Sequence, residues 1–189
     1  MSRGRKIVVA ITGASGSIYA KRLLEYLQQM PEQYDCVDLV FSKNAKEVWK
    51  HELGEVSLLN LSFKEYDSND FYAPFASGSA GYDAMIICPS SMGTLGRIAN
   101  GISNDLITRA ADVMLKEGKQ LVLVPRETPF NLIHLRNMTH LAEAGAVIIP
   151  AIPSFYSKPE SIEQLVDTVV HRVLQRADFD LESFRWGAK

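Results

Sequence analysis

The sequence has few cysteines and no apolar run long enough to cross a membrane. Only two of the 189 residues are cysteines, Cys36 and Cys88, and they do not form a CxxC pair. This sparse usage predicts buried thiols in a reducing compartment, rather than a disulfide or a metal site. The apolar run behind the basic N-terminus, Ile7 to Ile11, is too short for a signal-peptide core or a membrane span. We therefore expect a cytoplasmic protein that does not enter a membrane.

A strong charge of either sign is also lacking. The formal net charge is -2, which predicts no general attraction to nucleic acid or to a membrane surface. None of the four histidines has metal-ligand spacing such as HExxH, so we expect no metal site. The composition, 47% hydrophobic and 22% charged, is ordinary for a globular chain, and the length suits a single domain over residues 1–189.

Short apolar runs rich in Val and Ile alternate with segments of helical spacing. Because the runs are continuously apolar, they predict strands buried on both faces, as in a parallel sheet. The expected strands are Lys6–Thr12, Val37–Ser42, Ala84–Cys88, Leu121–Pro125 and Ala146–Pro150, and helical patterns begin near Ile18, Ala45, Ile107, Ile133 and Ile162. This order predicts an α/β fold, with one doubly wound, mostly parallel sheet and helices on both faces, Rossmann-like or flavodoxin-like.

Ser62–Gly81 is the least regular segment, rich in Ser, Asp, Gly and aromatic residues. We expect a long surface excursion there. Its phrase Ala76-Ser77-Gly78-Ser79 is compatible with a ligand loop and equally with an ordinary loop.

Ligands of doubly wound sheets bind beyond the carboxyl ends of the strands, so the residues after each strand are informative. The first strand runs into Thr12-Gly13-Ala14-Ser15-Gly16-Ser17 and then a helix. Free amides at a helix N-terminus suit a phosphate, and Ser15 and Ser17 add hydroxyl donors. The alternative is a tight strand–helix turn with a serine cap.

The same loop argues against a dinucleotide. It partly resembles the TGxxxGxG loop of short-chain dehydrogenases, but Tyr19 stands where their last glycine belongs. No tyrosine of the chain is followed four residues later by lysine, so the YxxxK pair of those enzymes is missing. The second strand ends in Ser42 rather than in the Asp or Glu that holds the ribose of NAD. A mononucleotide fits better.

Other candidate residues each have a plainer alternative. The stretch Ser91–Thr94 offers hydroxyls that can donate to a flavin, or Ser91 simply caps a helix. Arg126 directly follows a strand and can hold a phosphate in bidentate fashion, or it forms a surface ion pair with Glu127. Arg109 and Lys116, seven residues apart on one helix, and Glu52, near the end of the second helix, would ordinarily be solvated.

Together these loops resemble the UbiX family of flavin prenyltransferases. The matching phrases are collinear and cover nearly the whole chain. They are residues 12–16, Ser42-Lys43, 76–79, 88–91, 108–113 (Thr-Arg-Ala-Ala-Asp-Val), 115–117, 124–129 (Val-Pro-Arg-Glu-Thr-Pro), His134-Leu135, 145–148, Phe155-Tyr156 and Arg185-Trp186. The Arg-Glu-Thr-Pro and Thr-Arg-Ala-Ala-Asp-Val phrases are the most specific.

The resemblance implies an activity. The family joins a dimethylallyl group, taken from dimethylallyl phosphate, to N5 and C6 of reduced FMN without a metal. The product, prenylated FMN, serves UbiD-type decarboxylases, including those of ubiquinone synthesis. The resemblance also suggests a homo-oligomer, a dodecamer built from trimers, with sites formed between subunits. Whether the donor is the monophosphate or the diphosphate stays open.

The resemblance also assigns residues by motif. FMN would be held by Gly13, Ala14, Ser15, Ser42, Ser91, Met92, Gly93, Thr94 and Arg126. Dimethylallyl phosphate would be bound by Tyr156 and Arg172, with Arg109, Lys116 and Glu127 around the same phosphate. Glu52 would be the acid/base near N5, and Trp186 would help to close the site. Cations aimed at a leaving phosphate, and aromatic faces beside an allyl cation, suit this chemistry.

Three rival functions fit the sequence less well. A flavin-dependent cysteine decarboxylase would have a catalytic histidine early in the chain and a Pro-x-Met-Asn phrase, whereas the first histidine here is His51 and the late strand is followed by Pro125-Arg126-Glu127-Thr128. A flavodoxin-like electron carrier would present an acidic surface, against which the cations Arg109, Lys116, Arg126 and Arg172 argue. Direct decarboxylation of an aromatic acid would need a set of residues that stabilises an aryl anion, and the sequence shows no such set.

Overall fold

The computed structural model describes residues 4–54, 62–184 and 187. Its centre is a six-stranded, entirely parallel sheet in the order β3-β2-β1-β4-β5-β6. The strands are β1 (Lys6–Ile11), β2 (Cys36–Phe41), β3 (Lys64–Tyr66), β4 (Ala84–Ser90), β5 (Gln120–Pro125) and β6 (Val147–Ile148). The strand order reverses at β1, which pairs with β2 on one side and β4 on the other. The predicted doubly wound sheet is confirmed.

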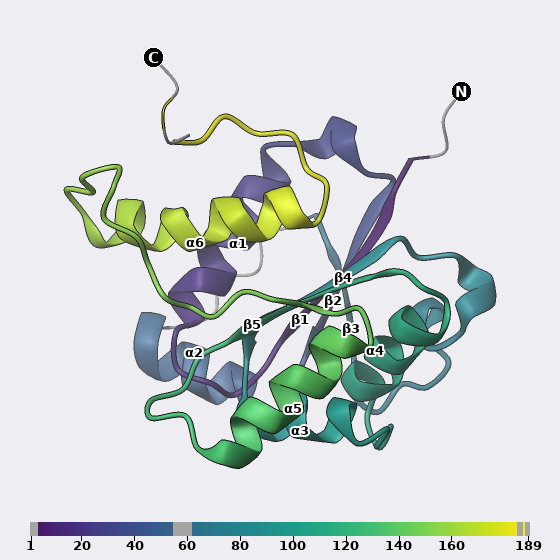
Figure 1. Ribbon diagram of the computed structural model, residues 1–189. Helices are drawn as coiled ribbons and strands as arrows, with labels where there is room; N and C mark the ends of the chain where they lie inside the picture. Colours follow the sequence, from purple (N-terminus) through teal and green to yellow (C-terminus); the bar gives the residue numbers. More distant parts are fainter. Residues whose placement is uncertain (1–3, 55–61, 185–186, 188–189) are drawn as a thin grey trace.

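Helices cover both faces of the sheet (Figure 1). They are α1 (Ser17–Gln28), α2 (Ala45–Leu53), α3 (Met92–Ala99), α4 (Leu106–Lys116), α5 (Leu132–Glu143) and α6 (Ile162–Arg176). The buried faces of α1, α2 and α6 share one apolar cluster with alternate residues of β1, such as Ile7 and Val9. The buried faces of α3, α4 and α5 share a second cluster with the other residues of β1, Val8 and Ala10. Both faces of β1 are therefore buried, which explains its unbroken apolar run.

Local signals position the helix starts. Asp105 and Asn131 each form a capping box with the residue three positions on, at the starts of α4 and α5. Ser161 caps α6 through the amide of Gln164. The N-cap residue of α1, Gly16, has a left-handed φ of 108° and caps nothing itself. No helix within the described ranges is long and apolar enough to cross a membrane.

The prediction of a surface excursion at 62–81 is wrong in two respects. Residues Lys64–Tyr66 pair with β2 as an edge strand, in the register Asp38↔Lys64. Phe75 is completely buried, with its ring edge-on to Tyr66 and to Tyr82 at centroid distances of 5.1 and 5.6 Å. A three-residue edge strand is too short to show a period, and a single buried aromatic leaves no pattern, so the sequence did not reveal either.

Two of the five predicted strands, β4 and β6, differ from expectation by more than one residue. β4 continues through a cis Cys88–Pro89 peptide to Ser90, with a register shift against β5 between Ile87 and Ser90. β6 is only two residues long, whereas its apolar run predicted five. As an edge strand it has a partner, β5, on one side only.

Candidate active site

The ends of β1, β2, β4 and β5 converge at the carboxyl edge of the sheet. The Thr12 hydroxyl donates to the carbonyl of Pro89 at 2.8 Å and accepts from the amide of Ser91 at 2.7 Å, which joins the loops after β1 and β4. The Ser42 amide donates to the Ile11 carbonyl at 2.8 Å. These bonds place the Gly13–Ser17 loop, Ser42 and the Ser91–Thr94 stretch side by side.

Arg126 completes this edge from β5. Its amide donates to the carbonyl of Ser90 at 3.3 Å, and its side-chain Cγ lies 3.8 Å from the place that a Cβ on Gly16 would take. No ion pair joins Arg126 to Glu127 among the described residues, so the plainer alternative for Arg126 is not what the structure has. The Glu127 carboxylate instead accepts from the amide of Thr128 at 2.9 Å, and Arg126 is exposed at this edge.

A carboxylate occupies the N-terminus of α1. Both oxygens of Glu52 lie 3.0 Å from the amide nitrogen of Gly16, and one lies 2.7 Å from that of Ser17. These are the amides in which the sequence suggested a phosphate site. Because the residue before α1 is a glycine without a side-chain cap, a residue far along the chain supplies the capping group.

This environment keeps Glu52 ionised. Partial burial raises the pKa of its carboxyl group, but the Ser15 hydroxyl and the amides of Ser17 and Gly16 outweigh that effect, so the pKa lies below its ordinary value. A carboxylate held as an anion can accept a proton, and the loop that holds it lies at the strand ends where a ligand would bind. Glu52, the weakest candidate from spacing alone, thus has a specific position in the fold.

Ser91 is the N-cap of α3, as the plainer alternative suggested. Its hydroxyl oxygen accepts from the amide of Thr94 at 3.2 Å, and the two hydroxyl oxygens lie 3.0 Å apart. Capping does not preclude ligand binding here, because this cap lies at the edge where the other loops meet. The hydroxyl of Thr94, the amide of Gly93 and the Arg126 guanidinium are donors and a cation suited to a flavin mononucleotide.

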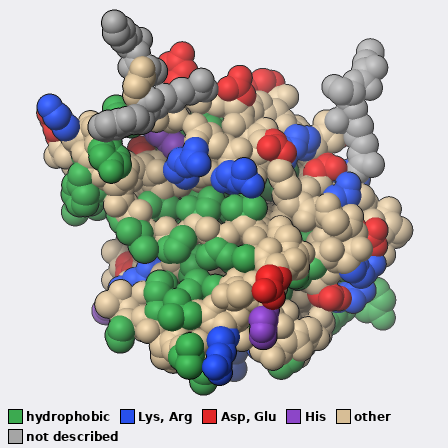
Figure 2. Space-filling model, viewed as in Figure 1, with side chains coloured by type: hydrophobic (Ala, Val, Ile, Leu, Met, Phe, Trp, Pro, Cys, Tyr) green, Lys and Arg blue, Asp and Glu red, His purple; other side chains and the backbone are tan. Residues whose placement is uncertain are grey.

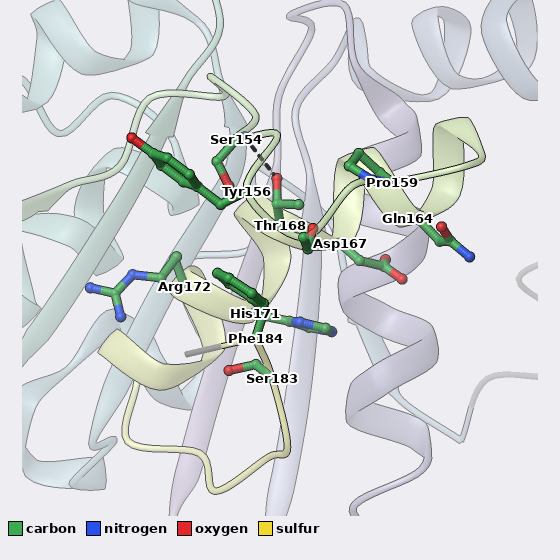
Figure 3. A pocket seen from close by; sticks show the side chains of 11 residues that line it. Ser154, Tyr156, Pro159, Gln164, Asp167, Thr168, His171, Arg172, Ser183 and Phe184 are labelled. Carbon is green, nitrogen blue, oxygen red and sulfur yellow. Dashed lines mark hydrogen bonds between the residues drawn. The ribbon is translucent and has the colours of Figure 1, made fainter. Parts of the chain in front are cut away.

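Tyr156 and Arg172 line a cavity of about 430 Å³ between α6, the loop after β6 and residues 183–184. In Figure 3, both side chains extend to the same side of α6, and those of Asp167 and His171 extend to the other. The loop is attached to α6 by the amide of Ser154, which donates to the Thr168 hydroxyl at 3.1 Å. Trp186, which the resemblance assigned to closing this region, lies outside the described residues.

Asp167, which lines this cavity, forms an ion pair that joins α6 to α1. The Asp167 carboxylate accepts from Arg22 through Nε and Nη2, both at 2.8 Å, and from the Tyr26 hydroxyl at 2.9 Å. The His171 ring stacks edge-on against Tyr26 at 4.9 Å, and its Nε2 is buried without a partner. Burial lowers the pKa of His171, with Asp167 acting in the opposite direction, so the wall carries a neutral imidazole at neutral pH.

Arg109 and Lys116 are not brought to this edge within one chain. Arg109 donates to the carbonyl of Ala76 at 3.0 Å and pairs with Asp112 at 3.1 Å. Lys116 ends α4 at the amino edge of the sheet, close to the start of β5, where it pairs with Glu117 at 2.5 Å. The carboxylate of Glu117 lies against Gly78. The two cations and the Ala76–Ser79 phrase therefore form a group apart from Glu52.

Sequence reasoning gave no function to two residues at the site. Tyr19 packs against Gly16. Burial raises the pKa of its hydroxyl above the ordinary value, and the charge of Arg126 opposes this rise without cancelling it. Arg97 contacts the Thr94 hydroxyl from the next turn of α3. The position of Tyr19 directly after the loop was a usable signal. Nothing in the spacing distinguished Arg97 from a solvated arginine.

Comparisons with known proteins agree on one family. The family profile described as Flavoprotein matches residues 1–174. A protein of Methanocaldococcus jannaschii named flavin prenyltransferase UbiX is 47% identical over 187 residues, which cover 96% of this chain and 98% of that protein.

Solved structures give the same picture. AnUbiX (PadA1), determined in complex with FMN and dimethylallyl pyrophosphate, is 45% identical with a TM-score of 0.90, covering 97% of this chain and 98% of that one. A dodecameric FMN-dependent UbiX-like decarboxylase from Escherichia coli O157:H7 is 39% identical with a TM-score of 0.91, covering 97% and 100%.

Proposed function

Since the chain belongs to the Flavoprotein family, and within it to the UbiX-type flavin prenyltransferases, we propose that it joins a dimethylallyl group to N5 and C6 of reduced FMN. The observation that carries the proposal is the Glu52 carboxylate, held as an anion by the amides of Gly16 and Ser17 at the ligand-binding edge. A base in that position can take the proton that must leave the flavin when the new bond forms.

The residues at this edge fit a flavin mononucleotide. Gly13, Ala14, Ser15, Ser42 and the stretch Ser91–Thr94 supply amides and hydroxyls for carbonyl and phosphate oxygens. Arg126 supplies the cation that a phosphate requires. No carboxylate follows β2 to hold a second ribose, so a dinucleotide is not accommodated by the usual contact. Reduced flavin, when bound, supplies the nucleophilic N5 and C6.

The cavity beside α6 is the proposed site of the prenyl donor. Arg172 would bind the leaving phosphate and Tyr156 would present its ring to the allyl group. Charge accumulates on the phosphate as the carbon–oxygen bond breaks, so cations close to it lower the barrier. One chain supplies Arg172 here. We propose that Arg109 and Lys116 reach such a phosphate from another copy, since Lys116 lies at the opposite edge of the sheet and Arg109 is held by Ala76 and Asp112.

We propose that the protein is a homo-oligomer, a dodecamer. One reason is that Arg109 and Lys116 would have to come from another copy, and the second is an exposed hydrophobic surface. Large hydrophobic side chains are exposed on α5 and on the loop after β6, among them Leu132, Ile133, Ile152 and Phe155, at 60 to 71% exposure. Figure 2 shows a broad band of hydrophobic side chains across this face. An exposed apolar area of this kind is typical of a subunit interface.

The product, prenylated FMN, would be passed to a UbiD-type decarboxylase, including those of ubiquinone synthesis. This recipient is inferred from the family and not from any surface of the chain. We place the reaction in the cytoplasm, because Cys36 and Cys88 are both free thiols.

The test is anaerobic incubation of the purified protein with reduced FMN and dimethylallyl phosphate, followed by mass spectrometry of the released flavin. We expect a mass gain of one C5 unit. A parallel incubation with the diphosphate distinguishes the two donors. Bound but unmodified FMN with both donors would contradict the transferase and leave an electron carrier or a decarboxylase as the function.

A further inference from the structure

Arg97 connects the Ser91–Thr94 stretch to the start of α4. One guanidinium nitrogen, Nη1, lies 2.5 Å from a carboxylate oxygen of Asp105 and 2.7 Å from the side-chain oxygen of Asn104. The other, Nη2, lies 3.3 Å from the hydroxyl oxygen of Thr94. The ion pair is partly buried, with side-chain exposures of 30% for Arg97 and 19% for Asp105. The guanidinium is therefore fixed from three directions.

These bonds determine whether the Thr94 hydroxyl can donate or accept a further hydrogen bond. Its oxygen accepts from the Ser91 hydroxyl at 3.0 Å and from Arg97 at 3.3 Å, and the Thr94 amide is already used on Ser91. A hydroxyl has two acceptor positions and one proton. With both acceptor positions occupied, Thr94 can only donate to a further partner.

We propose that Arg97 is a positioning residue for the flavin. It holds the Thr94 hydroxyl as a donor toward an acceptor oxygen of the bound mononucleotide, a ring carbonyl or a phosphate oxygen. The inference rests on the proposed function, because Thr94 is among the residues assigned to FMN. An N–H group of the flavin would find no acceptor at this position.

Asp105 gives the arrangement its rigidity. It is the N-cap of α4, where it accepts from the amide of Thr108 at 2.8 Å. Its carboxyl loses solvation by burial, but the bonds from Thr108 and Arg97 keep its pKa below the ordinary value, so the charge that anchors Arg97 persists. Because one nitrogen of Arg97 serves Asp105 and the other serves Thr94, a lysine with its single ammonium cannot replace both contacts.

The test is a double-mutant cycle on the affinity for FMN, measured by quenching of flavin fluorescence. Thr94→Val and Arg97→Met should each weaken binding about five- to tenfold, the equivalent of one hydrogen bond. If Arg97 acts through the Thr94 hydroxyl, the double variant should bind no more than about twofold more weakly than Thr94→Val alone. Arg176→Met, at an exposed arginine of α6, is the matched control and should bind like the wild type.

A strictly additive cycle, or a wild-type affinity in Arg97→Met, would overturn the inference. Arg97→Lys covers the case in which Arg97→Met fails to fold. It retains the charge beside Asp105, and it should fold and still show the weaker binding; full affinity would also overturn the inference. A wild-type protein that does not bind FMN contradicts the proposed function itself. A wild-type protein that binds and prenylates FMN, with no loss in the Arg97 variants, contradicts only the positioning role.

Discussion

The carboxylate of Glu52, in the last turn of α2, accepts a hydrogen bond of 2.7 Å from the amide of Ser17, the first residue of α1. The two residues are 35 positions apart in the chain. The positive end of the α1 dipole and the negative carboxylate stabilise each other. A proposed catalytic group is thereby also a structural cap of the helix that begins at the ligand loop.

Replacing Glu52 with Gln should therefore affect both catalysis and stability. We expect prenylated FMN to fall by at least about 100-fold, because glutamine cannot accept the proton. The loss of the anionic cap should lower the free energy of unfolding by about 1 kcal/mol. Mass spectrometry of the flavin and chemical denaturation measure the two effects. Full activity in Glu52→Gln would exclude it as the base.

The same contact predicts a pH dependence. The pKa of Glu52 in the folded chain lies below its unfolded value, so the contact stabilises the fold above the unfolded pKa. That stabilisation should be lost as the pH falls through the lower, folded pKa. The free energy of unfolding of the wild type should exceed that of Glu52→Gln by a constant amount at neutral pH, and this difference should shrink only in the acid range. A difference that disappears near pH 7 would contradict an ionised Glu52.

The Arg22–Asp167 ion pair should contribute more to the free energy of unfolding than an exposed ion pair does. Its side chains are 22% and 12% exposed, and Asp167 also accepts from Tyr26. Asp167→Ala should cost about 2 kcal/mol, since it removes the acceptor of the Tyr26 hydroxyl and of two Arg22 nitrogens, although Arg22 keeps its pair with Glu25 at 2.7 Å. The double variant Arg22→Met/Asp167→Ala should cost less than the sum of the single variants. Chemical denaturation measures all three, and additive losses would contradict the coupling.

Phe75 and Tyr72 form a matched pair of aromatic residues in one segment. Phe75 is 0% exposed and Tyr72 is 99% exposed. Phe75→Ala should lower the free energy of unfolding by about 3 to 5 kcal/mol because it leaves a cavity, whereas Tyr72→Ala should change it by no more than about 0.5 kcal/mol. Equal effects of the two substitutions in thermal or chemical unfolding would show that this segment does not pack as described.

Mixed oligomers test whether Lys116 serves a neighbouring copy. Glu52→Gln and Lys116→Ala should each be inactive alone. In co-expressed, randomly mixed assemblies, about a quarter of the sites should combine an intact Glu52 from one subunit with an intact Lys116 from another. We expect product formation to recover to about that level. An assembly with no recovery would place both residues in the same chain's site, or outside it.

The sequence by itself determined the class of fold and the loops that carry the chemistry. Continuous apolar runs such as Ile7–Ile11 can only be satisfied by burial on both faces, and this requirement produces a parallel sheet covered by helices. Strand ends then follow from the same pattern, so Gly13, Ser42, Ser91 and Arg126 were predicted to share one edge. The structure brings the loops that carry them together.

Only the tertiary structure decided which groups meet across that edge. Glu52 reaches the Gly16 amide and Arg97 reaches Asp105 because α2 docks on α1 and α3 docks on α4, which the periodicity of each helix does not encode. The burial of Phe75 within an irregular segment depends likewise on neighbours distant in the chain. Periodicity reports which face of an element is buried, whereas the identity of the partner depends on how the elements dock.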